Sequence, residues 1–228
     1  MMDRQASYLR EMGLVRWRFG SGGNGLSEPE PGSPESGAQD RGGDETPGLL
    51  SLAEKARHCE RCELHRTRGK VVFGSGSPGA RWFFVGEAPG AEEDKQGVPF
   101  VGRAGALLHA MLLGIGLSRE SVYIANVLKC RPPNNRDPFG LEVQECSPFL
   151  HAQIELIQPQ IIVAMGRFAA QALLNSAESL GQLRGKAHQY RLNQLPLVVT
   201  YHPAYLLRSP AAKGKTWEDL VLAQSLLT

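Results

Sequence analysis

Four short apolar runs, separated by helical patterns, constrain the fold of this chain more than any other feature. The runs cover residues 82–85, 122–125, 161–164 and 197–200. Runs of this kind are typical of strands buried on both faces of a parallel sheet. Helical patterns cover residues 105–113, 137–157, 167–174 and 216–227. The second helix is expected to begin with Asp137 as its N-cap and Pro138 as its first residue. This alternation predicts a three-layer α/β/α fold around a central four-stranded parallel sheet.

The four cysteines of the chain suit a single metal centre. Cys59 and Cys62 form a C-x2-C pair, whereas Cys130 and Cys146 stand alone far downstream. We find no signal peptide and no apolar stretch long enough to span a membrane, so we expect a cytoplasmic protein with reduced thiols. A structural zinc site usually presents two close pairs of ligands, while four thiolates from distant points suit a [4Fe-4S] cluster. Zinc and ordinary buried thiols remain alternatives at this point.

The first 48 residues differ in composition from the rest. Residues 21–48 consist mainly of Gly, Pro, Ser and acidic residues, which predicts a disordered linker. We therefore expect an N-terminal extension over 1–48 and a single folded domain over 49–228. The extension is a candidate for binding another protein.

The expected domain is basic, with 20 basic against 15 acidic side chains. The basic residues around the first cysteine pair are Lys55, Arg57, Arg61, Arg66, Arg68 and Lys70. Such a patch attracts a polyphosphate backbone. Glu54, Glu60 and Glu63 interleave with it, so a solvated surface explains the pattern equally well.

A tight turn follows the first apolar run, at the edge of the sheet where ligands of such folds bind. It reads Gly86-Glu87-Ala88-Pro89-Gly90, and its backbone N–H groups could face a ligand. The turn matches neither a P-loop nor a dinucleotide-binding pattern, and a structural turn is the simpler interpretation. In the next loop, the ring of Phe100 is either part of the core or a stacking platform.

Polar residues also follow the second and fourth runs. Asn126 can present an acceptor and a donor together, which is the pattern that reads the edge of a base, or it can cap the following loop. His202 stands at a turn stiffened by Pro203, with Arg208 shortly beyond it. The other histidines lack such a setting, and we expect them on the surface or in packing.

In combination, these motifs resemble those of the family 4 (iron–sulfur) uracil-DNA glycosylases, within the uracil-DNA glycosylase superfamily. The resemblance rests on the four cysteines and, in chain order, on Gly86-Glu87-Ala88-Pro89-Gly90, Pro99-Phe100-Val101-Gly102, Asn126 with Lys129-Cys130-Arg131-Pro132-Pro133, and His202-Pro203-Ala204-Tyr205-Leu206. It covers residues 49–228 and leaves the extension unmatched. It implies a monofunctional DNA repair hydrolase that flips uracil out of DNA and hydrolyses its N-glycosidic bond. The abasic site that results is a substrate for base excision repair.

The resemblance implies a uracil-binding pocket in these loops. Glu87 and Ala88 would line the pocket, and Phe100 would stack on the base. Glu93 would occupy the space that a 5-methyl group needs and so exclude thymine. Asn126 would hydrogen-bond the uracil edge, which disfavours cytosine because a mismatch leaves buried polar groups unpaired.

The same resemblance implies the catalytic residues. His202 would stabilise the negative charge that grows on uracil O2 as the glycosidic bond breaks. Many members of the superfamily have an aspartate where this chain has Ala88, so a dissociative route is the better hypothesis here. Glu87 is then the only acid expected close enough to orient water.

Contacts with DNA are implied for Pro89, Gly90, Tyr205, Leu206 and Arg208. Leu206 or Tyr205 would enter the duplex where the base has left, and Arg208 would hold a phosphate. The expected partner is therefore uracil-containing DNA, single- or double-stranded. The expected protein is a monomer that works in the cytoplasm with the nucleoid and not at a membrane.

The cysteines Cys59, Cys62, Cys130 and Cys146 would bind a structural [4Fe-4S] cluster, as the resemblance implies. Two other classes of protein remain open. A binding module for damaged DNA would share the basic patch and the cysteines, but it would not need Phe100, Asn126 and His202 together at strand ends. A zinc-dependent nuclease would need carboxylates and histidines at metal-ligand spacing, which the sequence does not offer.

Overall fold

The computed structural model describes residues 47–191 and 194–227. Nearly all of the expected N-terminal extension therefore lies outside the described residues, and the helix α2, Pro47–Arg57, already includes the last two positions assigned to it. None of the helices in the two described ranges is long and apolar enough to cross a membrane.

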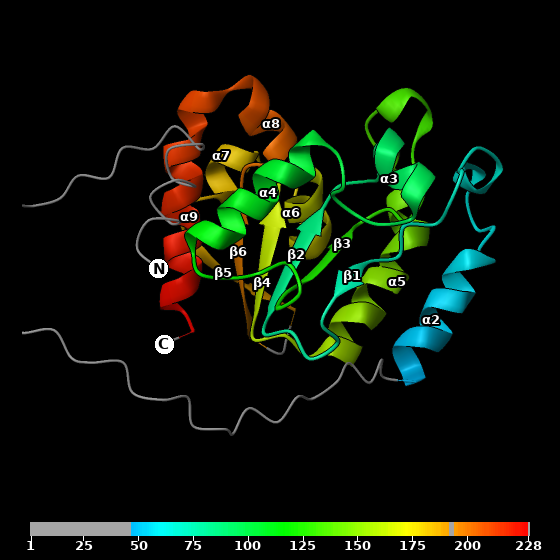
Figure 1. The fold of residues 1–228 in the computed structure, drawn as a ribbon, viewed down its shortest axis with the longest axis horizontal. Helices are drawn as coiled ribbons and strands as arrows, with labels where there is room; N and C mark the ends of the chain where they lie inside the picture. The colour runs from blue at the N-terminus through cyan, green and yellow to red at the C-terminus, as the bar shows by residue number, and fades with distance from the viewer. Residues whose placement is uncertain (1–46, 192–193, 228) are drawn as a thin grey trace, which may run out of the picture.

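The sheet contains the four predicted parallel strands at its centre (Figure 1). These are β2 (Trp82–Gly86), β3 (Tyr123–Asn126), β4 (Ile161–Met165) and β6 (Leu195–Thr200). The strand order is β1-β3-β2-β4-β6-β5, and the central pairs are parallel. Two antiparallel edge strands, β1 (Ser75–Gly76) and β5 (Ala187–Tyr190), were not predicted. Neither has an apolar run, because one is only two residues long and the other is largely exposed.

Eight α-helices of the described residues surround this sheet. They are α2, α3 (Ala91–Gln96), α4 (Arg103–Gly114), α5 (Gly140–Ile157), α6 (Arg167–Leu174), α7 (Leu180–Leu183), α8 (Pro203–Arg208) and α9 (Lys213–Ser225). Short 3-10 turns cover Glu63–Arg66, Pro133–Asn135 and Pro210–Ala212. The four predicted helices are confirmed as α4, α5, α6 and α9, with shifted ends for α5 and α9.

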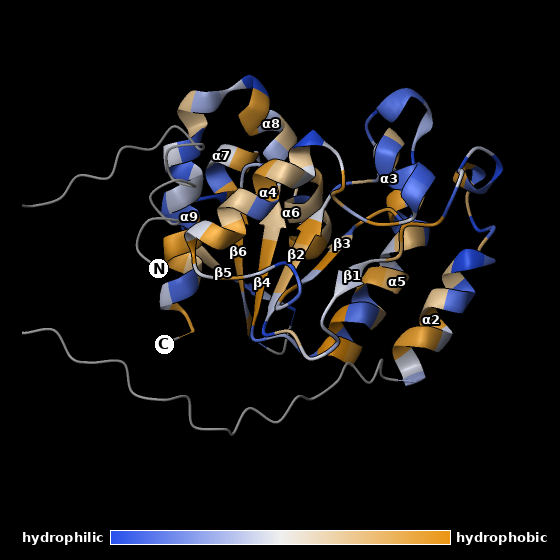
Figure 2. Cartoon of the chain, viewed as in Figure 1, coloured by the Kyte–Doolittle hydropathy of each residue, from blue (hydrophilic) through white to orange (hydrophobic). Residues whose placement is uncertain are grey.

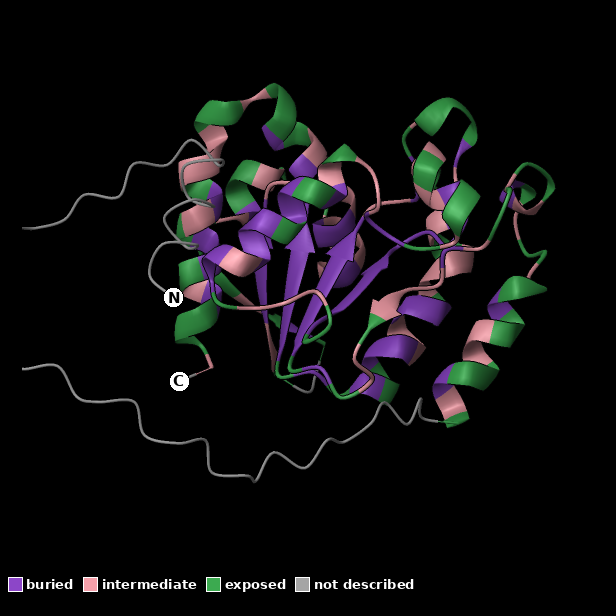
Figure 3. Ribbon diagram, viewed as in Figure 1, coloured by how far each residue is buried: buried purple, intermediate pink, exposed green. Residues whose placement is uncertain are grey.

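Two apolar layers pack against the faces of the sheet, which confirms the three-layer architecture. Along β2, Trp82 and Phe84 face a core shared with α4, α8 and α9, whereas Phe83 and Val85 face a core shared with α5, α6 and α7. All of β2, β3 and β4 is buried, and these strands form the apolar centre of the molecule (Figures 2 and 3). Alternate residues of one run thus stabilise opposite layers.

The start of α5 differs from the prediction. The helix begins at Gly140 and its N-cap is Phe139, because the backbone remains extended at Arg136 and again at Phe139. The carboxylate of Glu142 accepts a hydrogen bond from the backbone N–H of Phe139 (2.8 Å), so it satisfies the donor that Asp137 was expected to cap. Asp137 is therefore free to face the functional site.

Candidate active site and metal centre

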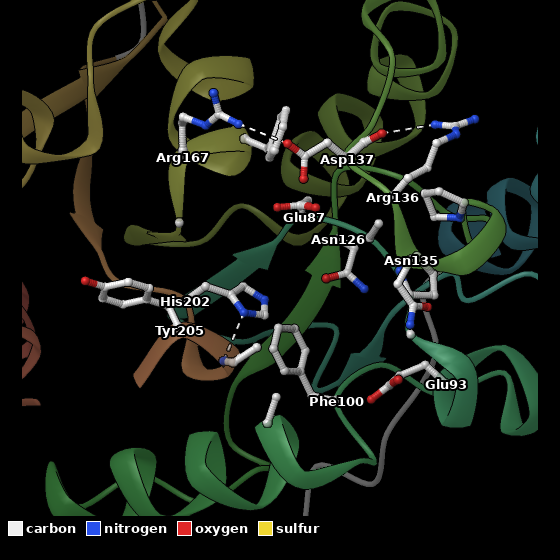
Figure 4. A pocket seen from close by; sticks show the side chains of 18 of the residues that line it. Glu87, Glu93, Phe100, Asn126, Asn135, Arg136, Asp137, Arg167, His202 and Tyr205 are labelled. Carbon is white, nitrogen blue, oxygen red and sulfur yellow. Dashed lines mark hydrogen bonds and ion pairs between the residues drawn. The ribbon is translucent and has the colours of Figure 1, made fainter. Parts of the chain in front are cut away.

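A cavity of about 690 Å³ opens at the carboxyl ends of the central strands. Its lining includes every predicted uracil- and DNA-contacting residue except Leu206, namely Glu87, Ala88, Pro89, Gly90, Glu93, Phe100, Asn126, His202, Tyr205 and Arg208. Figure 4 shows that Asn126, Phe100 and His202 come from three different segments and surround one opening. The parallel sheet produces this convergence because its strands end at the same edge.

Asn126, the last residue of β3, presents an unpaired amide oxygen. Its side chain is buried, and its Oδ1 atom has no hydrogen-bond partner among the described residues. Gly86 makes this position possible, since a Cβ atom there would lie 2.3 Å from Asn126 Oδ1 and 2.6 Å from Phe100 Cζ. A buried polar atom without a partner is costly, and a ligand with a complementary N–H group would remove that cost.

Phe100 is held in an unusual backbone conformation. Its φ angle is +54°, in the left-handed region that residues with a side chain seldom adopt. On one side, Glu93 Oε1 accepts hydrogen bonds from the N–H groups of Val101 (3.0 Å) and Gly102 (3.1 Å). On the other, Arg119 donates to the carbonyl oxygen of Phe100 (2.8 Å). These contacts direct the ring into the cavity, where its centroid lies 5.5 Å from that of His202.

His202 carries its proton on the nitrogen that faces away from the chain. It is the N-cap of α8, and its Nδ1 atom accepts a hydrogen bond from the backbone N–H of Ala204 (3.1 Å), which leaves the proton on Nε2. Burial lowers the pKa of His202 to about 4, and the charge of Arg208 acts in the same direction. Near neutral pH the ring is therefore an uncharged donor.

Glu87 has an environment that favours its protonated form. Burial raises the pKa of Glu87 to about 7; the charge of Asp137 adds to this effect, and that of Arg167 opposes it. Asp137 and Arg167 form an ion pair (3.2 Å) on the rim of the cavity. From the sequence, both residues were expected only at helix starts. Arg167 directly follows the turn after β4, so its position beyond a strand end was a signal for the site.

Leu206 was predicted to contact DNA, and the structure corrects this prediction. Its side chain is only 1% exposed and belongs to the core that α8 shares with α4 and α9. The side chain of Tyr205 is 40% exposed and lies on the cavity rim. Because successive residues of a helix point in different directions, only Tyr205 of this pair faces solvent.

The four cysteines line one small hollow beside α5, although they come from three separate segments. The backbone N–H of Lys129 donates to Cys146 Sγ (3.2 Å), and Arg68 Nη1 donates to Cys130 Sγ (3.4 Å). Within the described residues, no group of three or more cysteine, histidine or carboxylate side chains could hold a single metal ion. Four thiols around one hollow, with N–H donors directed at two of the sulfurs, fit the thiolate ligand set of an iron–sulfur cluster.

Comparisons with known proteins identify the family. The sequence model of the Uracil DNA glycosylase superfamily matches residues 73–221 of this chain. A type-4 uracil-DNA glycosylase of Archaeoglobus fulgidus is 48% identical over 177 residues, which are 75% of this chain and 89% of that protein. The type-4 uracil-DNA glycosylase of Pyrobaculum aerophilum is 45% identical over 76% of this chain and 92% of its own length. That of Thermotoga maritima is 44% identical over 77% of this chain and 93% of its own length. The chain therefore belongs to the type-4 uracil-DNA glycosylases of the uracil DNA glycosylase superfamily.

Proposed function

We propose that this protein excises uracil from DNA by hydrolysing the N-glycosidic bond, which leaves an abasic site for base excision repair. The observation that carries the proposal is the buried, unpaired Oδ1 of Asn126 beside Phe100 and the neutral ring of His202. A flipped uracil can offer its N3–H to that oxygen, its face to the phenyl ring and its O2 to the histidine.

Base selection is assigned to four residues. Asn126 accepts the N3–H of uracil and can donate to O4, whereas cytosine would place an acceptor against an acceptor. Phe100 stacks on the base, an interaction worth about 1–3 kcal/mol. Glu93 is fixed by two backbone N–H groups. Its carboxylate and the side chain of Ala88 both line the cavity, where they can limit the space for a 5-methyl group.

Catalysis is assigned to His202 and Glu87. As the glycosidic bond breaks, its electron pair moves onto the base, and negative charge accumulates on O2. The Nε2–H group of His202, whose ring is neutral near pH 7, donates to that oxygen and stabilises the developing charge. The sugar becomes oxocarbenium-like, and water adds to it on the side where Glu87, in its carboxylate form, orients the attacking molecule.

The DNA-contacting residues are Pro89, Gly90, Tyr205 and Arg208 on the rim of the cavity. Tyr205 is the wedge that fills the space left by the flipped base, since it is exposed and its ring stacks on that of Tyr201 at 5.1 Å. Arg208 supplies a positive charge for a neighbouring phosphate. The substrate is uracil-containing DNA, and the protein acts on it as a monomer in the cytoplasm.

The type-4 family typically carries a [4Fe-4S] cluster. In this chain, Cys59, Cys62, Cys130 and Cys146 are the proposed ligands, and the cluster acts as a structural crosslink. Arg68 supports this role, because its guanidinium donates to the carbonyl oxygens of Cys59 (2.7 Å) and Arg57 (2.8 Å) as well as to Cys130. The cluster thereby joins the segment after α2 to the loop after β3.

The proposal is tested with a duplex oligonucleotide that contains one uracil, followed by alkali to break abasic sites, with thymine and cytosine oligonucleotides alongside. Strand breaks at uracil alone are expected. Asn126→Ala should slow excision by roughly 10²-fold, because the site then lacks its base-reading amide. Protein that binds the DNA but releases no uracil would favour a binding module instead.

A further inference from the structure

Lys129 is a buried cation between the cavity and the cysteines, and the roles proposed above do not use it. Its side chain is 2% exposed. The ammonium group donates to the backbone oxygen of Asn126 (2.7 Å) and to Oε1 of Gln153 (2.6 Å). Gln153 is also fully buried and is held by a hydrogen bond from its Nε2 to the carbonyl oxygen of Phe73 (3.0 Å). Both ends of this network are therefore anchored in the core.

The contact with Asn126 fixes the peptide unit that follows the base-reading side chain. The oxygen of that unit accepts from Lys129, and its N–H group, which belongs to Val127, donates to the carbonyl oxygen of Gly86 (3.0 Å). A planar peptide unit held at both its oxygen and its nitrogen cannot rotate, so the backbone ψ angle of Asn126 is set. The direction of the Asn126 side chain relative to Phe100 depends on this angle.

At its other end, Lys129 is tied to the cysteines. Its own N–H group donates to Cys146 Sγ (3.2 Å), and the next residue is Cys130. No carboxylate among the described residues forms an ion pair with Lys129, whose ammonium group donates only to the uncharged oxygens of Asn126 and Gln153. A buried charge is strongly destabilising unless a counter-charge compensates it. A cluster bound by four thiolates would provide that counter-charge.

We infer that Lys129 is a positioning residue through which the iron–sulfur cluster fixes the uracil-reading residue Asn126. This inference rests on the proposed function and adds to it a link between the two sites. The hydrogen bond to Cys146 ties the backbone of Lys129 to the cysteines, the ammonium group of Lys129 holds the Asn126–Val127 peptide unit, and that unit directs the amide at the base.

The test compares the iron-loaded wild type with Lys129→Met and with a matched control, Arg131→Met. Arg131 is a basic residue that also adjoins Cys130, but its guanidinium donates to Asn135 Oδ1 (2.8 Å) and not to Asn126. Three quantities are measured: the iron content, the inhibition constant of free uracil, and hydrogen exchange at the Val127 amide. Free uracil isolates base recognition from DNA binding.

In Lys129→Met we expect the affinity for free uracil to fall about tenfold, because a hydrogen bond from a charged donor is lost. Exchange at Val127 should rise while exchange in β4 stays slow. Arg131→Met should keep both properties of the wild type. Wild-type affinity for uracil in iron-loaded Lys129→Met would overturn the inference.

If Lys129→Met binds less iron than the wild type, the inference is tested instead by hydrogen exchange in wild-type protein from which a chelator has removed the iron. We then expect exchange to rise more at Val127 than in β4, and a rise no larger than that of β4 would overturn the inference. A wild type that neither excises nor binds uracil would contradict the proposed function alone, since the exchange comparison does not depend on it.

Discussion

The guanidinium group of Arg119 donates a hydrogen bond to the backbone oxygen of Phe100 across 2.8 Å, and a second one to the oxygen of Pro99. Arg119 follows α4 and does not line the cavity, yet it holds the residue whose ring does. The neighbouring helix α4 approaches this loop at Gly105, where a Cβ atom would lie 1.8 Å from the Phe100 oxygen. A stacking ring in a left-handed backbone conformation is thus stabilised from outside the site.

Replacement of Arg119 should therefore weaken base binding before it affects chemistry. In Arg119→Met two carbonyl oxygens lose their donor, and the loop that carries Phe100 gains freedom. We expect KM for uracil-containing DNA to rise about tenfold, with a smaller change in kcat. Arg81→Met is the control, because Arg81 lies at the opposite end of β2 and donates to Gln160 (2.6 Å). Equal kinetics of Arg119→Met and the wild type would refute this role.

The excision rate should depend on the protonation of Glu87. Its pKa is about 7, so the group is a neutral acid below that pH and a carboxylate above it. The carboxylate is a stronger hydrogen-bond acceptor and a stronger base toward the attacking water than the neutral acid is, and the single-turnover rate should therefore rise with pH through about 7. His202, with a pKa of about 4, does not change charge in this range. Glu87→Gln should abolish the rise and slow excision by roughly 10²-fold. A pH profile that the substitution leaves unaltered would exclude Glu87 as the water-orienting group.

Substitutions at Tyr205 and Leu206 should separate DNA insertion from core packing. Tyr205→Ala should slow excision from duplex DNA about tenfold and leave single-stranded substrates little changed, because only a duplex needs the vacated space filled. Leu206→Ala should instead lower the free energy of unfolding by roughly 2–5 kcal/mol, as expected for a buried leucine. Denaturant unfolding and single-turnover assays on both substrates distinguish the two effects, and the reverse pattern would restore Leu206 as the wedge.

Loss of one cysteine should affect the fold around the proposed cluster more than the chemistry at the pocket. Cys62→Ser should lower the iron content and the melting temperature, because the segment after α2 then loses its crosslink to Cys130 and Cys146. Ser147→Ala is the matched control, since Ser147 adjoins Cys146 but donates only to Val143 within α5 (2.6 Å). Iron analysis and thermal unfolding provide the measurements. Full iron content in Cys62→Ser would exclude Cys62 as a ligand.

The central sheet was predictable because its signal is local. A run such as 82–85, apolar at every position, has few stable alternatives to a doubly covered parallel strand, and all four runs became such strands. The positions after those runs then indicated most of the cavity. Edge strands such as β5 could not be predicted in this way, since pairing with β6 and not burial determines them.

The four-strand core, the strand ends where the polar residues stand and the set of cysteines could all be predicted from the amino-acid sequence. The orientation and support of single side chains depend on the folded structure. In the folded structure Leu206 is buried and Tyr205 is exposed. Asp137 does not cap a helix but forms an ion pair with Arg167. Arg119 and Lys129 donate to the backbone of the two residues proposed to read the base. Hydrophobic periodicity is a property of neighbours in the chain, so the sequence shows it directly. A hydrogen bond from Arg119 to Phe100 or from Lys129 to Gln153 depends on segments that meet only after folding.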